Sequence, residues 1–216
     1  MQPFLFWIED YFLDFSLANR LLDEWPSFES GQYIGDNGLP GEKSVHSEVG
    51  DLGPAFRELE RFLASPEFLA ELSCRTGIPF LLFDPSWFGG GTHENRHGQS
   101  LDQHIDFNNH PRQNWRRRLN LILSLTKSWQ AEWGGCLELH NSPCLPEDDY
   151  WLTVLPKFNR AVFFETSDYS WHGFKRINLP LAQRHMTRKT IACYFYQEHR
   201  YPHEHRTVYI KTTQQN

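Results

Sequence analysis

The sequence predicts a single domain of mainly β structure with packed helices, an α+β protein whose core is a jelly roll of two sheets. The 216 residues suit one domain, and the 39% hydrophobic and 15% aromatic content is typical of a sizeable β-rich core. The spacing of apolar residues changes from helical to strand-like near residue 80. Helices followed by many strands predict a β core with helices packed on one side.

The N-terminal portion, residues 1–79, is predicted to be mainly helical. Leu17, Leu21 and Trp25 recur at helical spacing, and therefore share one face of a helix. Pro54 suits the first turn of a second helix, and Ser65 is a suitable N-cap for a third. The predicted elements are a strand over residues 3–8, helices over 16–25, 54–64 and 66–74, and a long loop over 29–53 that can hold one short strand. We expect these helices to pack against the core and to frame a pocket or a homodimer interface.

The core, residues 80–197, has the pattern of a series of short strands. The predicted strands span residues 80–83, 100–107, 118–126, 136–140, 151–154, 161–165, 172–177 and 189–197. Gly, Pro, Asn and Asp residues separate them, as expected for turns between antiparallel strands. Residues 198–216 follow as a C-terminal tail.

Composition excludes several classes of partner. A net charge of −6 argues against a general nucleic-acid-binding protein, which requires a basic surface. No apolar run approaches the length of a membrane span, and the first 15 residues carry acidic residues instead of a basic signal-peptide start. The four cysteines have no C-x-x-C spacing, which favours reduced thiols in a cytoplasmic protein.

His104 and Asp106 form the motif on which the functional prediction depends. Two residues apart on a strand, their side chains leave the same face, so that both can reach one metal ion. With His172 they would complete a 2-His-1-carboxylate facial triad, which leaves positions open on non-heme Fe(II). A polar strand face or a turn is the alternative interpretation of the His104–Asp106 pair alone.

Five segments, in this order, resemble the double-stranded β-helix domain of Fe(II)/2-oxoglutarate-dependent dioxygenases, and most closely its prolyl 4-hydroxylase-like branch. The segments are residues 98–107, 118–126 followed by Trp129, 134–139, 156–164, and 170–172 with 188–191. The likeness lies within residues 80–197, about half of the chain, and is weaker over residues 1–79.

The resemblance implies a role for each matched residue. His104, Asp106 and His172 would bind Fe(II). Arg188 would pair with the distal carboxylate of 2-oxoglutarate, with Thr190 beside it. A planar guanidinium can hold a carboxylate through two parallel hydrogen bonds, which suits Arg188 to this role.

The sequence departs from the family pattern in two places. The connection between His172 and Arg188 is longer than usual, which makes Arg184 a rival for the carboxylate; we favour Arg188 because it begins an alternating aromatic strand. Ser124 stands where the hydroxylase branch often has a tyrosine that contacts 2-oxoglutarate. Serine is too short to reach as far, and Asn120, on the same strand face, could supply a contact instead.

The predicted activity is hydroxylation of an unactivated C–H bond with molecular oxygen, releasing succinate and CO2, with ascorbate keeping the iron reduced. The resemblance makes a prolyl residue one candidate substrate, beside free amino acids, sugar-containing compounds and other small metabolites. The main alternative is a non-catalytic, cupin-like jelly roll that binds a ligand. A zinc hydrolase ranks last, because no general base is evident.

Three further motifs have less specific interpretations. The basic run of residues 116–118 is expected to be a solvated turn, with contact to an anionic group of the substrate as the alternative. The glycines of residues 89–91 could form a mobile flap. His199, His203 and His205 are interleaved with charged residues, which favours an exposed tail over a metal site.

Overall fold

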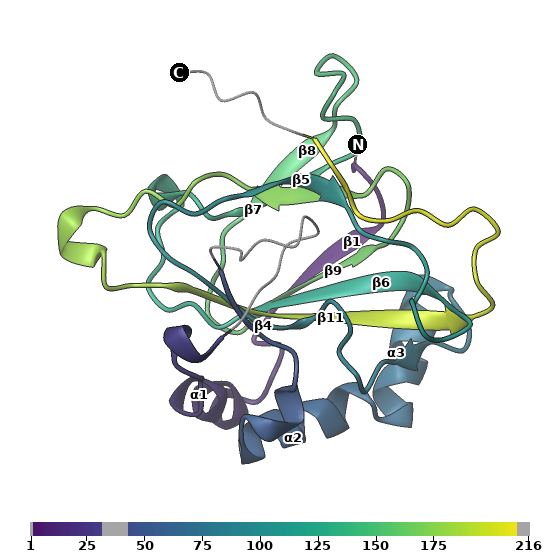
Figure 1. The fold of residues 1–216 in the computed structure, drawn as a ribbon, viewed down its shortest axis with the longest axis horizontal. Helices are drawn as coiled ribbons and strands as arrows, with labels where there is room; N and C mark the ends of the chain where they lie inside the picture. The colour runs from purple at the N-terminus through teal and green to yellow at the C-terminus, as the bar shows by residue number, and fades with distance from the viewer. Residues whose placement is uncertain (1, 32–42, 211–216) are drawn as a thin grey trace.

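The computed structural model describes residues 2–31 and 43–210, and it confirms the predicted fold class. Two antiparallel sheets face each other (Figure 1). The larger sheet has the strand order β1–β9–β6–β11–β4–β2, with β3 also paired to β11. Its strands are β1 (Phe6–Asp10), β9 (Arg160–Glu165), β6 (Trp115–Ser124), β11 (Arg188–Glu198), β4 (Gly91–Asn95), β2 (Ser44–His46) and β3 (Leu82–Phe83).

The smaller sheet has the order β12–β5–β10–β7–β8. Its strands are β12 (Val208–Tyr209), β5 (Leu101–Ile105), β10 (Trp171–Phe174), β7 (Leu137–His140) and β8 (Trp151–Val154). The faces that the two sheets turn toward each other enclose a pocket lined by residues of both. This double-sheet arrangement brings β5 and β10, which carry the two candidate histidines, next to one another.

Three helices cover the outer face of the larger sheet, opposite the smaller sheet (Figure 1). They are α1 (Phe15–Asp23), α2 (Pro54–Leu63) and α3 (Pro66–Thr76). The predicted cap of α3 is present, because Ser65 Oγ accepts a hydrogen bond from the Phe68 amide at 3.3 Å. Apolar residues of the helices, such as Leu21 and Leu59, join Phe163 and Phe195 of the sheet in one buried cluster. None of the helices in the described ranges is long and apolar enough to cross a bilayer.

Residues 1–79 contribute strands as well as helices. β1 pairs with β9 and β2 with β4, so both ends of the larger sheet come from this portion of the chain. Part of the predicted loop over 29–53 lies outside the described residues. Its described part holds β2 and two 3-10 turns, η1 (Phe28–Ser30) and η2 (Val49–Asp51); two more turns, η3 (Ala131–Trp133) and η4 (Leu181–Gln183), lie in the core.

β4 is a strand that the sequence did not predict, because it has no alternating apolar residues. It forms through pairing with β11 on one side and β2 on the other. The glycines at its start serve this packing: a Cβ on Gly90, just before the strand, would lie 2.5 Å from the Ala192 carbonyl oxygen, and one on Gly91, its first residue, would lie 2.1 Å from the His46 carbonyl oxygen. Close backbone contact, and not a flap, therefore accounts for glycine at these positions.

Candidate active site

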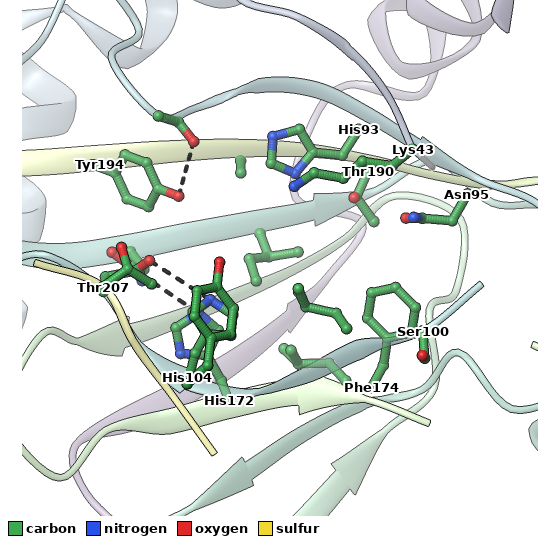
Figure 2. Close-up of a pocket in the computed structure, with 18 of the residues that line it drawn as sticks. Lys43, His93, Asn95, Ser100, His104, His172, Phe174, Thr190, Tyr194 and Thr207 are labelled. Carbon is green, nitrogen blue, oxygen red and sulfur yellow. Dashed lines mark hydrogen bonds and ion pairs between the residues drawn. The ribbon is translucent and has the colours of Figure 1, made fainter. Parts of the chain in front are cut away.

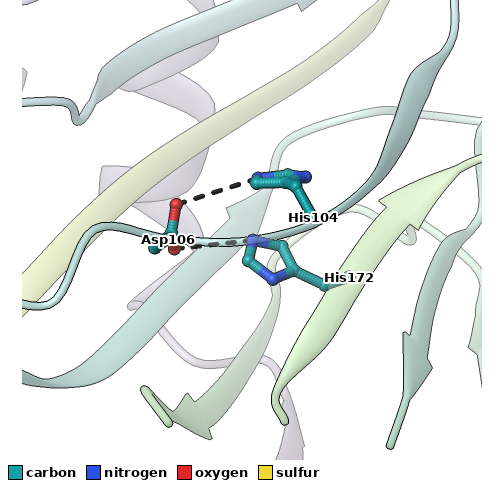
Figure 3. A group of neighbouring side chains, drawn as sticks. All are labelled: His104, Asp106 and His172. Atoms are coloured by element: carbon teal, nitrogen blue, oxygen red, sulfur yellow. Dashed lines mark ion pairs between the residues drawn. The ribbon is translucent and has the colours of Figure 1, made fainter. Parts of the chain in front are cut away.

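His104, Asp106 and His172 converge at one end of the pocket (Figure 3). His104 lies on β5 directly opposite His172 on β10, and their rings are 4.2 Å apart between centroids. Asp106 follows the end of β5, and its carboxylate oxygens lie 3.7 Å from His104 Nε2 and 3.5 Å from His172 Nε2. The three potential ligand atoms all lie within 4.8 Å of one another, and each residue is buried. The strand register thus brings together residues that are far apart in sequence.

Hydrogen bonds fix the orientation of both imidazoles. His104 Nδ1 lies 2.9 Å from the Asp102 carbonyl oxygen, and His172 Nδ1 lies 3.1 Å from that of Ser170. Since a carbonyl only accepts, each Nδ1 carries a proton, and each ring turns its Nε2 toward Asp106. Two imidazole nitrogens and one carboxylate that face one another suit a divalent cation as ligands. Metal-binding histidines are commonly oriented by hydrogen bonds to backbone carbonyls, as both rings are in this site.

Burial and a neighbouring cation set the protonation states of His104 and Asp106. Burial, reinforced by the neighbouring His172, lowers the pKa of His104 to about 3, so the ring is neutral near pH 7. Burial alone would raise the pKa of Asp106, but the Arg117 guanidinium holds it well below its ordinary value. The site therefore offers a neutral His104 imidazole and an ionised Asp106 carboxylate at neutral pH.

Arg117 is a part of the site that sequence reasoning missed, and its predicted place in a solvated turn is wrong. Its side chain is fully buried, and Nη1 lies 3.1 Å from Asp106 Oδ2. The guanidinium lies over the rings of Phe107 and Tyr194, 3.6 and 3.5 Å from their centroids. Arg118, in contrast, donates to Gln197 Oε1 at 2.6 Å and is only partly buried.

A β-bulge explains why the alternation of residues misled the prediction at Arg117. Consecutive residues Phe195 and Tyr196 of β11 face Leu119 and Arg117 of β6, which leaves Arg118 as the extra residue. Beyond this irregularity the side-chain alternation reverses, and Arg117 comes to the same face as Asn120.

Asn120 is also tied to the Asp106 carboxylate. Its Nδ2 donates to Asp106 Oδ2 at 2.7 Å, while its Oδ1 accepts from Thr166 Oγ1 at 3.1 Å. Asn120 lines the pocket, and the second hydrogen of its amide remains available there. The Asn120 amide and the Arg117 guanidinium thus both contact Asp106 Oδ2.

The pocket extends from the triad over a volume of about 570 Å³, within the usual range for small-molecule sites. Arg188 and Thr190 line it, and both are buried. Arg188 Nε donates to the Gly135 carbonyl at 2.7 Å, and its Nη1 lies 3.5 Å from Thr190 Oγ1. Burial lowers the pKa of Arg188 to about 10, which leaves it cationic at neutral pH. It forms no ion pair with an acidic residue of the described chain, so its charge is available to an anion.

The two candidate arginines are separated clearly by their environments. Arg184 is exposed at the end of η4 and does not line the pocket, whereas Arg188 is 4% exposed and does. Ser124 is buried beside Thr190, which it faces across the β6–β11 pair. Its hydroxyl lies 3.4 Å from the Thr126 amide, and its short side chain stays against the wall of the sheet.

The C-terminal tail forms a wall of the pocket that the sequence did not predict. Thr207 and Tyr209 line the pocket, and β12 pairs with β5 so that the Tyr209 ring stacks on that of His104 at 5.0 Å. Asn108 anchors this segment, accepting from the His205 amide at 3.1 Å and donating to the His203 carbonyl at 2.7 Å. Within the described chain, the triad is the only group of three such side chains close enough to share a metal ion, so the tail histidines form no such cluster.

Solved structures with the same fold include several oxygenases. A prolyl hydroxylase from Trichoplax adhaerens, in complex with a hypoxia inducible factor oxygen degradation domain peptide fragment, is 14% identical with a TM-score of 0.60, over 88% of this chain and 83% of that chain. A Pseudomonas putida prolyl-4-hydroxylase is 15% identical with a TM-score of 0.57, over 89% and 92% of the two chains. HygX from Streptomyces hygroscopicus, with nickel and 2-oxoglutarate bound, is 13% identical with a TM-score of 0.57, over 89% and 82%.

The sequence itself matches one family model. No curated protein matches the chain. Residues 90–196 match the model described as the 2OG-Fe(II) oxygenase superfamily. This range contains the triad, Arg117, Asn120, Arg188 and Thr190. The chain therefore belongs to the 2OG-Fe(II) oxygenase superfamily and is an iron- and 2-oxoglutarate-dependent dioxygenase.

Proposed function

We propose that His104, Asp106 and His172 bind the Fe(II) of this enzyme. The observation that supports this assignment most directly is the convergence of two Nε2 atoms and one carboxylate in a buried site, with both Nδ1 atoms bonded to carbonyls. Three protein ligands leave coordination positions for a cosubstrate and oxygen. Asn120 and Arg117 both contact Asp106 Oδ2 and hold the carboxylate in place.

Arg188 binds the distal carboxylate of 2-oxoglutarate in this proposal, and Thr190 and Asn120 provide further contacts. The cationic, buried Arg188 side chain lines the same pocket as the triad and has no acidic partner among the described residues. A guanidinium in this position can form two parallel hydrogen bonds with a carboxylate. The second amide hydrogen of Asn120 would face the part of the cosubstrate closer to the triad.

The enzyme couples oxidation of the cosubstrate to hydroxylation of a C–H bond. Bound Fe(II) supplies the activation of oxygen, by which 2-oxoglutarate is converted to succinate and CO2 while the substrate gains a hydroxyl group. The protein orients the cosubstrate and limits the access of water to the triad. The aromatic side chains of Phe107 and Tyr194 and the strand β12 limit the access of water to the triad, and Arg188 sets the direction in which the cosubstrate lies.

The substrate is proposed to be a peptidyl or small-molecule compound that enters the pocket beside the triad. A prolyl residue is supported by the prolyl hydroxylases among the structures of the same fold, one of which was solved with a peptide. A free amino acid or another small metabolite is supported by the pocket volume of about 570 Å³, which exceeds what the ten non-hydrogen atoms of 2-oxoglutarate fill. Stimulation of cosubstrate turnover by candidate compounds distinguishes these classes.

Three further features belong to the proposal. Ascorbate is the reductant that keeps the iron in the ferrous state. The cytoplasm is the compartment, which the four free cysteines of the structure support. A homodimer is the proposed assembly, and sedimentation of the purified protein at several concentrations tests it.

The proposed activity is tested by succinate release from 2-oxoglutarate with Fe(II) and ascorbate, in the presence and absence of candidate substrates. Wild-type protein is expected to turn over, whereas His104→Ala and Arg188→Ala are expected to lose at least about tenfold, the effect of one lost charged hydrogen bond or more. Arg184→Ala is the matched control, since this exposed arginine does not line the pocket. Equal loss in Arg184→Ala and Arg188→Ala would contradict the assigned anchor.

A further inference from the structure

The strand β4 extends the polar wall of the pocket beyond Arg188 and Thr190. In the β4–β11 pair, His93 lies directly opposite Thr190, and Asn95 lies directly opposite Arg188. Side chains of directly opposed residues share a face and have Cβ atoms about 5 Å apart. His93 and Asn95 both line the pocket, so the four residues form one continuous patch, which we call the β4–β11 patch. Figure 2 shows His93, Asn95 and Thr190 on the side of the pocket away from His104 and His172.

The other face of β4 has a different character. Glu94, between the two pocket residues, accepts from Lys189 Nζ at 2.7 Å and from Trp25 Nε1 at 2.9 Å. Its hydrogen bonds join β4 to β11 and to the helical layer. The strand therefore uses one face to hold the fold together and the other to present polar groups to the pocket.

Neither pocket-facing side chain of β4 has a hydrogen-bond partner within the described residues. Asn95 is 4% exposed and lines the pocket, so its amide can bond to a molecule bound there. Burial holds the pKa of His93 well below its ordinary value, with the Lys43 and Arg188 cations adding to the effect. His93 is therefore a neutral ring that can donate from one nitrogen.

The charges of the pocket indicate what kind of group the β4–β11 patch receives. Asp106 is the only acid among the described residues that line the pocket, and it lies at the triad end. At the other end, the Arg188 guanidinium, the Thr190 hydroxyl, the Asn95 amide and the His93 ring can all donate hydrogen bonds. Ser124, by contrast, is too short to supply the contact that a longer side chain would make there. A group with several acceptor atoms and a negative charge fits this patch best.

We propose that Asn95 and His93 of β4 bind the distal carboxylate of 2-oxoglutarate together with Arg188 and Thr190. This assignment rests on the proposed function and adds to it two residues that determine the choice of 2-oxo acid. The amide of Asn95 donates to one carboxylate oxygen, and the neutral ring of His93 donates to the same group from the Thr190 side. In this arrangement β4 replaces the contact that Ser124 cannot make.

The test compares two 2-oxo acids of equal chain length, 2-oxoglutarate and 2-oxopentanoate, which has a methyl group in place of the distal carboxylate. Binding to the Mn(II)-loaded protein is measured without oxygen by isothermal titration calorimetry. Asn95→Ala and His93→Leu are each expected to weaken 2-oxoglutarate binding about tenfold, the effect of one lost hydrogen bond to a charged group. Binding of 2-oxopentanoate is expected to stay within about twofold of wild type, because it makes no such bond.

Two further variants sharpen the comparison. Asn95→Asp is expected to weaken 2-oxoglutarate binding more than Asn95→Ala does, because it opposes one carboxylate with another. Arg184→Ala is the control, since Arg184 is exposed and does not line the pocket. It is expected to leave both affinities unchanged.

Each remaining outcome separates the inference from the proposed function. Equal weakening of both 2-oxo acids by Asn95→Ala would overturn the inference and assign Asn95 a purely structural part. Normal 2-oxoglutarate binding by the Asn95 and His93 variants, with binding lost in Arg188→Ala, would also overturn it while leaving the proposed function intact. Failure of the wild-type protein to bind 2-oxoglutarate would instead overturn the proposed function itself. The thermal unfolding midpoint of each metal-free variant verifies that it is folded.

Discussion

Replacement of Arg117 by methionine should strongly destabilise the metal-free protein. Arg117 is fully buried and its guanidinium lies 3.1 Å from Asp106 Oδ2, while the Asp106 side chain is only 9% exposed. The substitution leaves a buried carboxylate without its cation, although the Asn120 amide still donates a hydrogen bond to it. Removal of one partner of a buried ion pair costs about 3–5 kcal/mol, mostly because the other charge is left unpaired. For a protein of this size that corresponds to a decrease of roughly 6–20 °C in the unfolding midpoint.

A double-mutant cycle isolates the ion pair from the packing of the side chain. Asp106→Asn removes the charge that Arg117→Met leaves behind, so the double variant should be more stable than Arg117→Met alone. We expect a coupling free energy of about 2–3 kcal/mol. Arg118→Met is the control, because Arg118 is half-buried and bonds to Gln197 on the other side of the bulge. It should cost about 1 kcal/mol or less.

The assay is urea unfolding at pH 7 with a chelator present, followed by fluorescence of the eight tryptophans. A second series contains Mn(II), which should stabilise Arg117→Met more than it stabilises wild type, since the cation then compensates the Asp106 charge. A loss below about 1 kcal/mol for Arg117→Met, or a double variant no more stable than Arg117→Met, would refute the reasoning.

Three further predictions concern other parts of the molecule. Burial alone would lower the pKa of His140, but the nearby carboxylates of Glu138 and Asp149, the latter bonded to Nδ1, raise it above its ordinary value. The stability that His140 adds relative to His140→Gln should therefore be complete below about pH 6.5 and disappear as the pH rises through the raised pKa. Urea unfolding across pH 5.5–9 would show this loss, and an equal difference at all pH values would contradict it. Ser65→Ala should destabilise the protein by about 1 kcal/mol through loss of the α3 cap, whereas Ser65→Asp should retain most of the stability, and equal losses in both would argue against capping. Arg188→Lys should weaken 2-oxoglutarate binding by at least about tenfold, because an ammonium group cannot form the two parallel bonds of a guanidinium, and an unchanged dissociation constant in calorimetry would exclude a bidentate contact.

Much of the fold and the metal-binding motif could be predicted from local sequence. The helices of residues 1–79 follow from apolar spacing and from recognisable first-turn and cap residues such as Pro54 and Ser65. The pairing of His104 with His172 could be expected only through the resemblance to a family, because the register that brings them together depends on contacts across 68 residues of sequence.

The features that escaped prediction depend on tertiary contacts. β4 has no apolar alternation, and its conformation comes from two neighbouring strands. The burial of Arg117 depends on the bulge at Arg118, which reverses the strand faces and leaves no mark in the residue pattern. The place of Tyr209 over His104 requires the tail to return to the edge of β5, and two residues of strand are too short to be distinguished in a sequence.

The central claim is that the triad and Arg188 together form one site for Fe(II) and 2-oxoglutarate. The most direct measurement is an anaerobic titration of the Fe(II)-loaded protein with 2-oxoglutarate, followed by the visible metal-to-ligand charge-transfer absorption of the chelated 2-oxo acid. We predict a saturable band at one equivalent of iron for wild type and Arg184→Ala, a band that needs much more 2-oxoglutarate in Arg188→Ala, and none in His104→Ala. Absence of the band in wild type, or its persistence in His104→Ala, would contradict the account.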